Sequence, residues 1–177
     1  MLPTFYFVLP GLNNSGPGHW QTRWEAIYGF TRIHQQDWDY PVKDDWIHTI
    51  NEVIAPFPPH QVVLIGHSLA CATIAHWAAR HSRTIKGAFL VAPSDVEAPS
   101  YPGGTTGFKP MLLDPLPFPS IVVASSNDPF VTMERAALFA RQWGSHFEPV
   151  GDLGHINSDS GLGDWPQGYK LLQTFTQ

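Results

Sequence analysis

The sequence is poor in cysteine and contains no long apolar run. Cys71 is the single cysteine, so no internal disulfide can form, which fits a reducing compartment. The N-terminal Met-Leu-Pro-Thr carries no positive charge, and the apolar run 5–9 is too short for a signal peptide or a membrane span. The sequence therefore predicts a soluble, cytoplasmic protein without a membrane partner.

Basic residues and metal-ligating motifs are also scarce. Ten lysines and arginines against fifteen acidic residues give a formal net charge of -5, and no basic run occurs. Because nucleic acids and anionic membranes are bound by clustered cations, we expect neither partner. His19, His67 and His76 do not form an HExxH motif, and no Cys/His cluster occurs, so we expect no metal and no cofactor.

Hydrophobic residues, prolines and tryptophans are plentiful. The chain has 177 residues, of which 43% are hydrophobic, and we expect residues 1–177 to form a single domain. The seventeen prolines and seven tryptophans indicate long loops at one end of a sheet, some of them lined by aromatic side chains.

Segments typical of strands alternate with segments typical of helices. The expected strands are 4–9, 31–34, 62–65, 85–91, 120–124 and 146–150. The expected helices are 19–28 (with Trp20, Trp24 and Ile27 on one face), 42–54, a helix that ends at Arg80, 131–143 and 164–175. This alternation predicts an α/β fold, a three-layer α/β/α sandwich with six parallel strands. The aperiodic segment 92–119 is interpreted as an ordered flap over the site, carrying Tyr101, Phe108 and Met111.

A serine lies between the central strand and its following helix. The strand leads into Gly66-His67-Ser68-Leu69-Ala70, and strand, sharp turn and helix form the layout of a nucleophile elbow. The turn needs small neighbours, and Ala70 stands where the pattern usually has a second glycine. The alternative interpretation is that Ser68 only caps the helix.

A serine nucleophile needs a base, and the base needs an orienting partner. Reactive groups gather where parallel strands end. Asp128 follows the fifth expected strand and His155 the sixth, which gives the chain order Ser, Asp, His of α/β-hydrolases. His155 could instead be a loop histidine bonded to backbone, and Asp128 a helix cap. Asp95 and Asp152 are competing partners for the base.

The remaining site predictions concern backbone donors and a pocket. The loop 12–18 is rich in Gly and Asn and can place its N–H groups freely, so we expect the oxyanion hole to use the backbone of Leu69 and Leu12. The loop lacks the Lys-Ser/Thr of a phosphate-binding loop. Cys71 is interpreted as a small core residue. The expected pocket residues are Asn13, His19, Phe130, Ile156, Tyr101 and Phe108.

Several short motifs together resemble one family. They are Pro10, Gly11, His19, Trp20, Gln21 and Trp24, then Gly66–Leu69, Leu116–Ser120, Ala124–Val131, Trp143–Ser145, Gly154–Asn157 and Ser160–Gly163 with Trp165. The chain resembles the small YdeN-like or retinoblastoma-binding-type serine hydrolases of the α/β-hydrolase superfamily. The resemblance implies a minimal α/β-hydrolase fold without a large cap. It further implies a catalytic triad of Ser68 as nucleophile, Asp128 as acid and His155 as base.

Two functions from different classes fit these residues. The first is a serine hydrolase that forms an acyl-enzyme on a small-molecule ester, carboxylesterase-like (EC 3.1.1), although thioesterases and peptidases use the same constellation. The second is a non-catalytic binding or scaffold protein on the same fold. The two differ in that a scaffold has no reason to keep the three side chains together.

Overall fold

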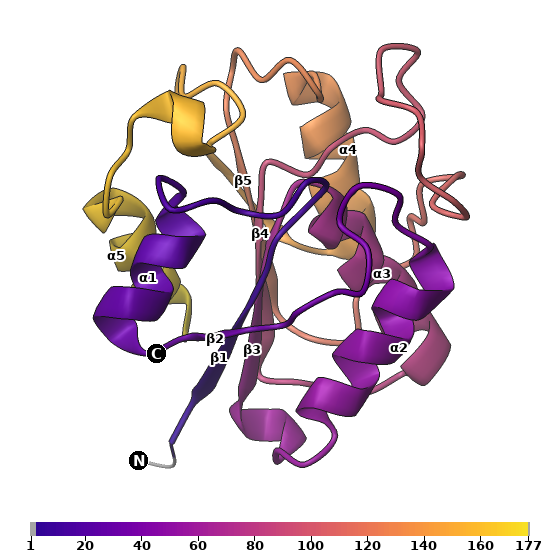
Figure 1. Ribbon diagram of the computed structural model, residues 1–177, viewed down its shortest axis with the longest axis vertical. Coiled ribbons are helices and arrows are strands. Elements are labelled where there is room, and N and C mark those ends of the chain that lie inside the picture. The colour runs from indigo at the N-terminus through magenta and orange to yellow at the C-terminus, as the bar shows by residue number, and fades with distance from the viewer. Residues whose placement is uncertain (1–2, 177) are drawn as a thin grey trace.

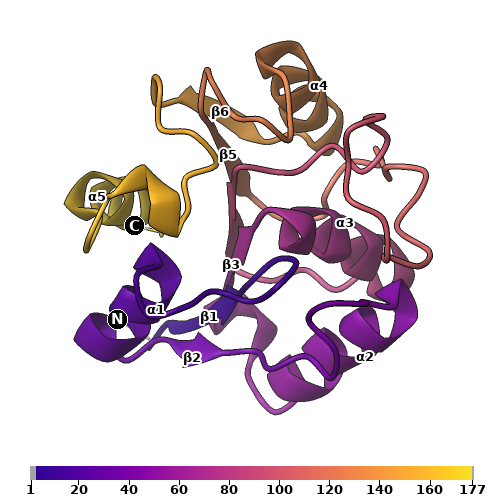
Figure 2. The ribbon, with the colours of Figure 1, turned by 45° about the horizontal axis from the view of Figure 1, so that its top comes forward.

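Six strands form one parallel sheet in the computed structural model, which describes residues 3–176. Residues 1, 2 and 177 of the predicted domain lie outside this range. The sheet order is β2-β1-β3-β4-β5-β6, and every neighbouring pair is parallel. Figures 1 and 2 together label all six strands. The strands are β1 (Phe5–Leu9), β2 (Thr31–Arg32), β3 (Val62–His67), β4 (Gly87–Val91), β5 (Ser120–Ala124) and β6 (His146–Pro149). The prediction of six parallel strands is confirmed.

Helices cover both faces of the sheet. Helices α1 (Trp20–Tyr28) and α5 (Pro166–Thr176) lie on one face, and α2 (Lys43–Ile54), α3 (Leu69–His81) and α4 (Met133–Trp143) lie on the other (Figures 1 and 2). Two separate clusters of buried apolar side chains fill the spaces between the sheet and each helical layer. The predicted three-layer α/β/α sandwich is therefore confirmed.

The helix faces follow the sequence pattern with one exception. Helix α2 buries Trp46, Ile47, Ile50 and Ile54, whose spacing is that of one face of an amphipathic helix. In α1, Trp20 and Trp24 are buried, but Ile27 is 49% exposed, so the buried face does not include all three residues predicted to share it. The packing contact in the last turn of α1 is made by Tyr28, whose ring stacks on that of Tyr169 with centroids 3.7 Å apart.

The central strand β3 positions the site. All six of its residues are buried, because β1 and β4 flank it and helices cover both of its faces. Its register pairs Leu9 with Gly66 and His67 with Val91, so the chain leaves β1, β3 and β4 at the same edge of the sheet. The loops that follow these strands consequently meet at that edge.

The segment between β4 and β5 does not form the predicted flap as a whole. Phe108 and Met111 are buried in the core between the sheet and the α2 side, with the Phe108 ring 5.9 Å from that of Trp46. These two predictions are wrong because the segment folds back against α2, where Thr106 forms a bridge with Val42.

Among the described residues, no helix has both the length and the apolar character needed to cross a membrane.

Candidate active site

Ser68 occupies the sharp turn between β3 and α3. Its backbone has φ 59° and ψ −121°, a conformation that costs a non-glycine residue about 1–3 kcal/mol. The turn is held because the Ser68 amide donates to the Val91 carbonyl at 3.0 Å. The Ser68 side chain makes no capping hydrogen bond, so the interpretation of Ser68 as a helix cap is wrong. Ala70 is fully packed in the core, so its methyl group fits this turn.

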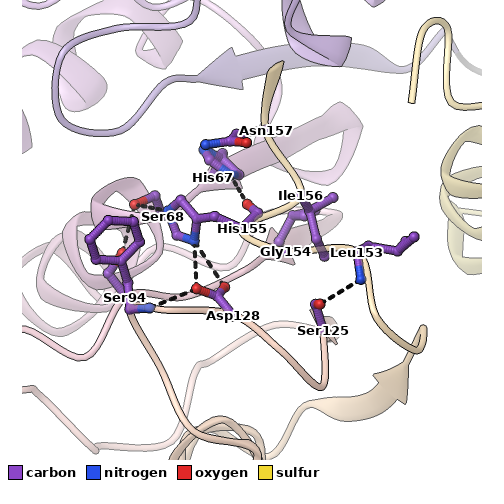
Figure 3. A network of polar contacts seen from close by, with 12 residues as sticks. His67, Ser68, Ser94, Ser125, Asp128, Leu153, Gly154, His155, Ile156 and Asn157 are labelled. Atoms are coloured by element: carbon purple, nitrogen blue, oxygen red, sulfur yellow. Dashed lines mark hydrogen bonds and ion pairs between the residues drawn. The ribbon is translucent and has the colours of Figure 1, made fainter. Parts of the chain in front are cut away.

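His155 links Ser68 to Asp128 (Figure 3). The Nε2 atom of His155 lies 2.9 Å from Ser68 Oγ, and its Nδ1 atom lies 2.9 Å from both carboxylate oxygens of Asp128. The Asp128 side chain is fully buried, and its Oδ1 also accepts the Phe130 amide at 2.8 Å. Because a carboxylate only accepts, Nδ1–H donates to it, and Nε2 is left to accept the serine proton.

The competing carboxylates lie elsewhere. Both oxygens of Asp95 accept from the Arg135 guanidinium, at 2.7 Å from Nε and 3.0 Å from Nη2. Asp152 is exposed to solvent. Among the described residues, Asp128 is therefore the carboxylate paired with the His155 imidazole.

Two ring donors from other elements anchor the loop that carries His155. The indole Nε1 of Trp20 donates to the Ile156 carbonyl, and His67 Nε2 donates to the His155 carbonyl, each at 2.8 Å. The β5–α4 loop supplies further anchors, Ser125 Oγ for the Leu153 amide at 2.8 Å and Asn127 Oδ1 for the Gly154 amide at 2.7 Å. The imidazole is thus held by segments far apart in sequence.

A cavity of about 280 Å³ opens in front of Ser68. It is lined by Leu12, Asn13, Asn14, Gly16, His19, His67, Ser68, Ser94, Tyr101, Pro102, Phe130, His155, Asn157 and Ser158. Of the expected pocket residues, Asn13, His19, Phe130 and Tyr101 line it, and so does Leu12. None of the lining residues is Lys, Arg, Asp or Glu.

Two of the expected pocket residues do not reach the cavity. Phe108 lies in the core beside α2, as described above. Ile156 has a positive φ of 47° and is completely buried in the core layer on the α1 and α5 side. Although Ile156 follows His155 in the sequence, its side chain does not face the cavity. The predictions of Phe108 and Ile156 as pocket residues are therefore wrong.

Gly11 brings the β1 loop against the elbow. A Cβ at this position would lie 2.8 Å from Ser68 Cβ and 2.9 Å from the His67 carbonyl oxygen. The same Cβ would lie 3.2 Å from the Leu69 amide nitrogen, so the backbone beside Leu12 closely approaches the start of α3. The Leu69 amide belongs to the first turn of α3, where N–H groups have no acceptor within the helix.

Buried Gln21 fixes this loop to the sheet. Its Nε2 donates to the carbonyls of Leu9 at 3.1 Å and Ile65 at 3.0 Å. These carbonyls lie in the C-terminal parts of β1 and β3. Its Oε1 accepts the Ser15 hydroxyl at 2.8 Å. The polar end of Gln21 is therefore fully occupied in holding two strand ends and the loop together.

Two buried histidines next to His155 are kept neutral. Burial, the charge of His155 and the charge of Arg32 lower the pKa of His19 to about 3. Burial lowers the pKa of His67 well below its usual value, and the neighbouring His19 and His155 lower it further. The three imidazoles form a row, with ring centroids 4.6 Å apart for His19–His67 and 4.8 Å for His67–His155.

The low pKa of His19 predicts a specific loss of stability in acid. Above pH 6.5 the ring is neutral in both the folded and the unfolded chain, and below it only the unfolded chain binds the proton. The free energy of unfolding should therefore fall by about 1.4 kcal/mol per pH unit on account of this ring, from about pH 6 down toward its folded pKa. His19→Asn should remove this part of the slope, because asparagine does not titrate and can still accept the Gln21 amide that His19 Nδ1 accepts at 3.1 Å.

Urea unfolding of the wild type and His19→Asn at several values between pH 7.5 and pH 4.5 measures both slopes. His48→Asn is the matched control, because His48 is exposed on α2. Identical slopes for wild type and His19→Asn would contradict a His19 that is held neutral in the folded protein.

Comparisons with known proteins agree with this fold. A protein-family model described as Serine hydrolase matches residues 6–174. A YdeN-like hydrolase from Pectobacterium atrosepticum has 32% sequence identity and a TM-score of 0.86, over 98% of this chain and 91% of that chain. The ydeN gene product of B. subtilis has 20% identity and a TM-score of 0.79, over 97% and 98% of the two chains. The Arabidopsis methylesterase MES16 has 14% identity and a TM-score of 0.64, over 97% and 98%. No curated protein matches the chain.

Proposed function

The chain belongs to the serine hydrolase family, in the YdeN-like branch of the α/β-hydrolase superfamily, and from this premise we propose that it hydrolyses small, uncharged carboxylic esters through an acyl-enzyme on Ser68. The observation that carries the proposal is the continuous set of hydrogen bonds from Ser68 Oγ through His155 to Asp128. A serine hydroxyl becomes an effective nucleophile when a positioned base accepts its proton.

The proposed reaction has two halves. Ser68 Oγ attacks the ester carbonyl carbon while its proton passes to His155 Nε2, and Asp128 stabilises the imidazolium. The backbone N–H groups of Leu69 and Leu12 donate to the oxyanion. His155 then protonates the departing alcohol, which leaves an acyl group on Ser68. In the second half, water replaces the alcohol and the same steps release the carboxylic acid.

The cavity supports a small and uncharged substrate. Its volume of about 280 Å³ is just below the range of about 300–1,000 Å³ that is typical of small-molecule sites. Its walls combine apolar groups such as Leu12 and Phe130 with the amides of Asn13 and Asn14, and no ionised side chain lines it. Large acyl donors with phosphate groups would find no cation there, so this lining favours a simple ester over a nucleotide-bearing thioester.

Covalent labelling tests the proposal. A fluorophosphonate probe should label the wild type at Ser68 and leave Ser68→Ala unlabelled, because the probe reacts with an activated serine hydroxyl. Ser120→Ala is the matched control and should label normally, because Ser120 is a buried serine at the start of β5, away from the cavity. Equal labelling of wild type and Ser68→Ala would refute the assignment. An unlabelled wild type would favour the non-catalytic binding protein.

A further inference from the structure

A second buried serine contacts the nucleophile directly. The Oγ atoms of Ser94 and Ser68 are 2.6 Å apart (Figure 3). Both residues line the cavity. Ser94 is only 2% exposed. Within residues 3–176, Ser68 Oγ is the hydrogen-bond partner of the Ser94 hydroxyl. Sequence reasoning missed this residue, because it follows β4 in a stretch without a motif.

The direction of this hydrogen bond follows from the histidine. Asp128 accepts from His155 Nδ1, so Nε2 carries a lone pair and accepts the single proton of Ser68. Ser68 Oγ must then be the acceptor in its contact with Ser94. The protons therefore all point one way, from Ser94 to Ser68 to His155 to Asp128.

Strong backbone contacts fix Ser94 in this position. Two residues before it, the Ala92 amide donates to the Val123 carbonyl at 2.8 Å. Immediately after it, the Asp95 amide donates to the Phe130 carbonyl at 2.9 Å, and the Asp95 carboxylate is paired with Arg135. The Ser94 hydroxyl is therefore held in place beside the nucleophile, as a preorganised donor should be.

We propose that Ser94 is a fourth catalytic side chain, whose hydroxyl donates to Ser68 Oγ and accelerates removal of the acyl group more than its attachment. This inference rests on the proposed acyl-enzyme mechanism. It concerns the oxygen atom that is a nucleophile in the first half of the reaction and a leaving group in the second.

The step concerned is the collapse of the second tetrahedral intermediate. Water has added to the acyl carbon and has given one proton to His155. The bond between that carbon and Ser68 Oγ then breaks, its electron pair goes to Oγ, and the proton on His155 Nε2 returns to Oγ as the carboxylic acid departs. Oγ gains negative charge before it is protonated, and hydrogen bonds to charged acceptors are stronger than those to neutral ones.

The two halves of the reaction gain unequally from this donor. In the free enzyme, the Ser68 hydroxyl already accepts the Ser94 hydrogen bond, so acylation gains only the strengthening that comes with charge. In the acyl-enzyme, Oγ is an ester oxygen and a poor acceptor, so deacylation gains nearly the whole hydrogen bond. Only interactions that are stronger in the transition state than in the starting state increase a rate.

Pre-steady-state hydrolysis of p-nitrophenyl acetate tests this inequality, because the burst gives the acylation rate and the later phase the deacylation rate. Ser94→Ala should slow deacylation about tenfold and acylation less than threefold. Ser94→Cys, which nearly preserves the volume and donates weakly, should show the same bias and serves if the alanine variant folds poorly. Ser120→Ala is the matched control, since Ser120 Oγ and Ser145 Oγ are also 2.6 Å apart, away from the cavity.

Equal slowing of both steps by Ser94→Ala and Ser94→Cys would overturn the inference, because it would give Ser94 a merely structural role. No slowing of either step would also overturn it. Fluorophosphonate labelling of Ser68 in the same preparations separates this outcome from failure of the proposed function. Loss of the inference leaves a labelled wild type that hydrolyses the ester, whereas failure of the proposed function leaves a wild type that does neither.

Discussion

Asp128→Asn is expected to reduce kcat by about 10⁴-fold while the chain keeps its fold. The cause is the proton arrangement on His155. In the wild type, the carboxylate accepts the Nδ1 proton and so leaves Nε2 free to accept the proton of Ser68. An asparagine can offer an N–H group at the same place, which would make Nδ1 the acceptor and put the proton on Nε2.

The surrounding backbone decides which way that asparagine faces. The Phe130 amide donates to Oδ1 of Asp128 at 2.8 Å, so the amide oxygen of asparagine should keep this position. The amide nitrogen then replaces Oδ2, which lies 2.9 Å from His155 Nδ1. Oδ1 also lies 2.9 Å from Nδ1, but an Nδ1–H group would then face the amide N–H group at the Oδ2 position. The imidazole is therefore expected to favour the tautomer that cannot accept the serine proton.

Steady-state hydrolysis of p-nitrophenyl acetate measures this effect, with circular dichroism as a check on folding. Asp152→Asn is the matched control, because Asp152 is an exposed carboxylate three residues before the base. It should keep kcat within about twofold of wild type, as expected for a surface substitution. If Asp128→Asn retained more than a tenth of the wild-type kcat, or if Asp152→Asn were the damaging change, the assignment of Asp128 would be wrong.

Gly11→Ala is expected to reduce kcat/KM by about 10²-fold or more and to destabilise the fold by about 1–3 kcal/mol. The new methyl carbon would lie 2.8 Å from Ser68 Cβ and 2.9 Å from the His67 carbonyl oxygen, both too close for carbon. The β1 loop and the elbow must therefore separate. Their separation moves the Leu12 amide away from the place where it would meet the oxyanion, together with that of Leu69.

Gly18→Ala provides the comparison within the same loop. A Cβ there would meet Ser158 Cβ at 3.7 Å, an ordinary van der Waals distance, so activity and stability should stay close to wild type. Ester hydrolysis and urea unfolding measured on both variants separate the steric effect from the general cost of replacing glycine. Wild-type activity in Gly11→Ala would show that the two segments are not packed as closely as described.

The fold and the convergence of Ser68, Asp128 and His155 could be predicted because they depend on short-range patterns. The apolar run of β3 identifies a strand buried on both faces, and strands that alternate with helices form parallel sheets. Parallel strands end at a common edge, so residues just past β3, β5 and β6 meet without knowledge of any long-range contact.

The pocket lining could not be predicted in the same way, because it depends on where irregular segments turn. Phe108 and Tyr101 belong to the same segment, yet one packs against Trp46 in the core and the other lines the cavity. Ile156 has a positive φ, and its side chain lies in the core layer between the sheet and helices α1 and α5, away from the cavity. Ser94 was missed since its 2.6 Å contact with Ser68 joins two turns that are distant in the sequence.

The strand order also governs when during synthesis a chain can become reactive. β3 is the third strand to be synthesised, and β4, β5 and β6 then add in turn at the same edge of the sheet. The last of these, the edge strand β6, leads into His155. A growing polypeptide that stops before residue 155 contains Ser68 but lacks the imidazole of His155. A polypeptide truncated before His155 is therefore expected to lack the proposed hydrolase activity, even where its earlier strands form.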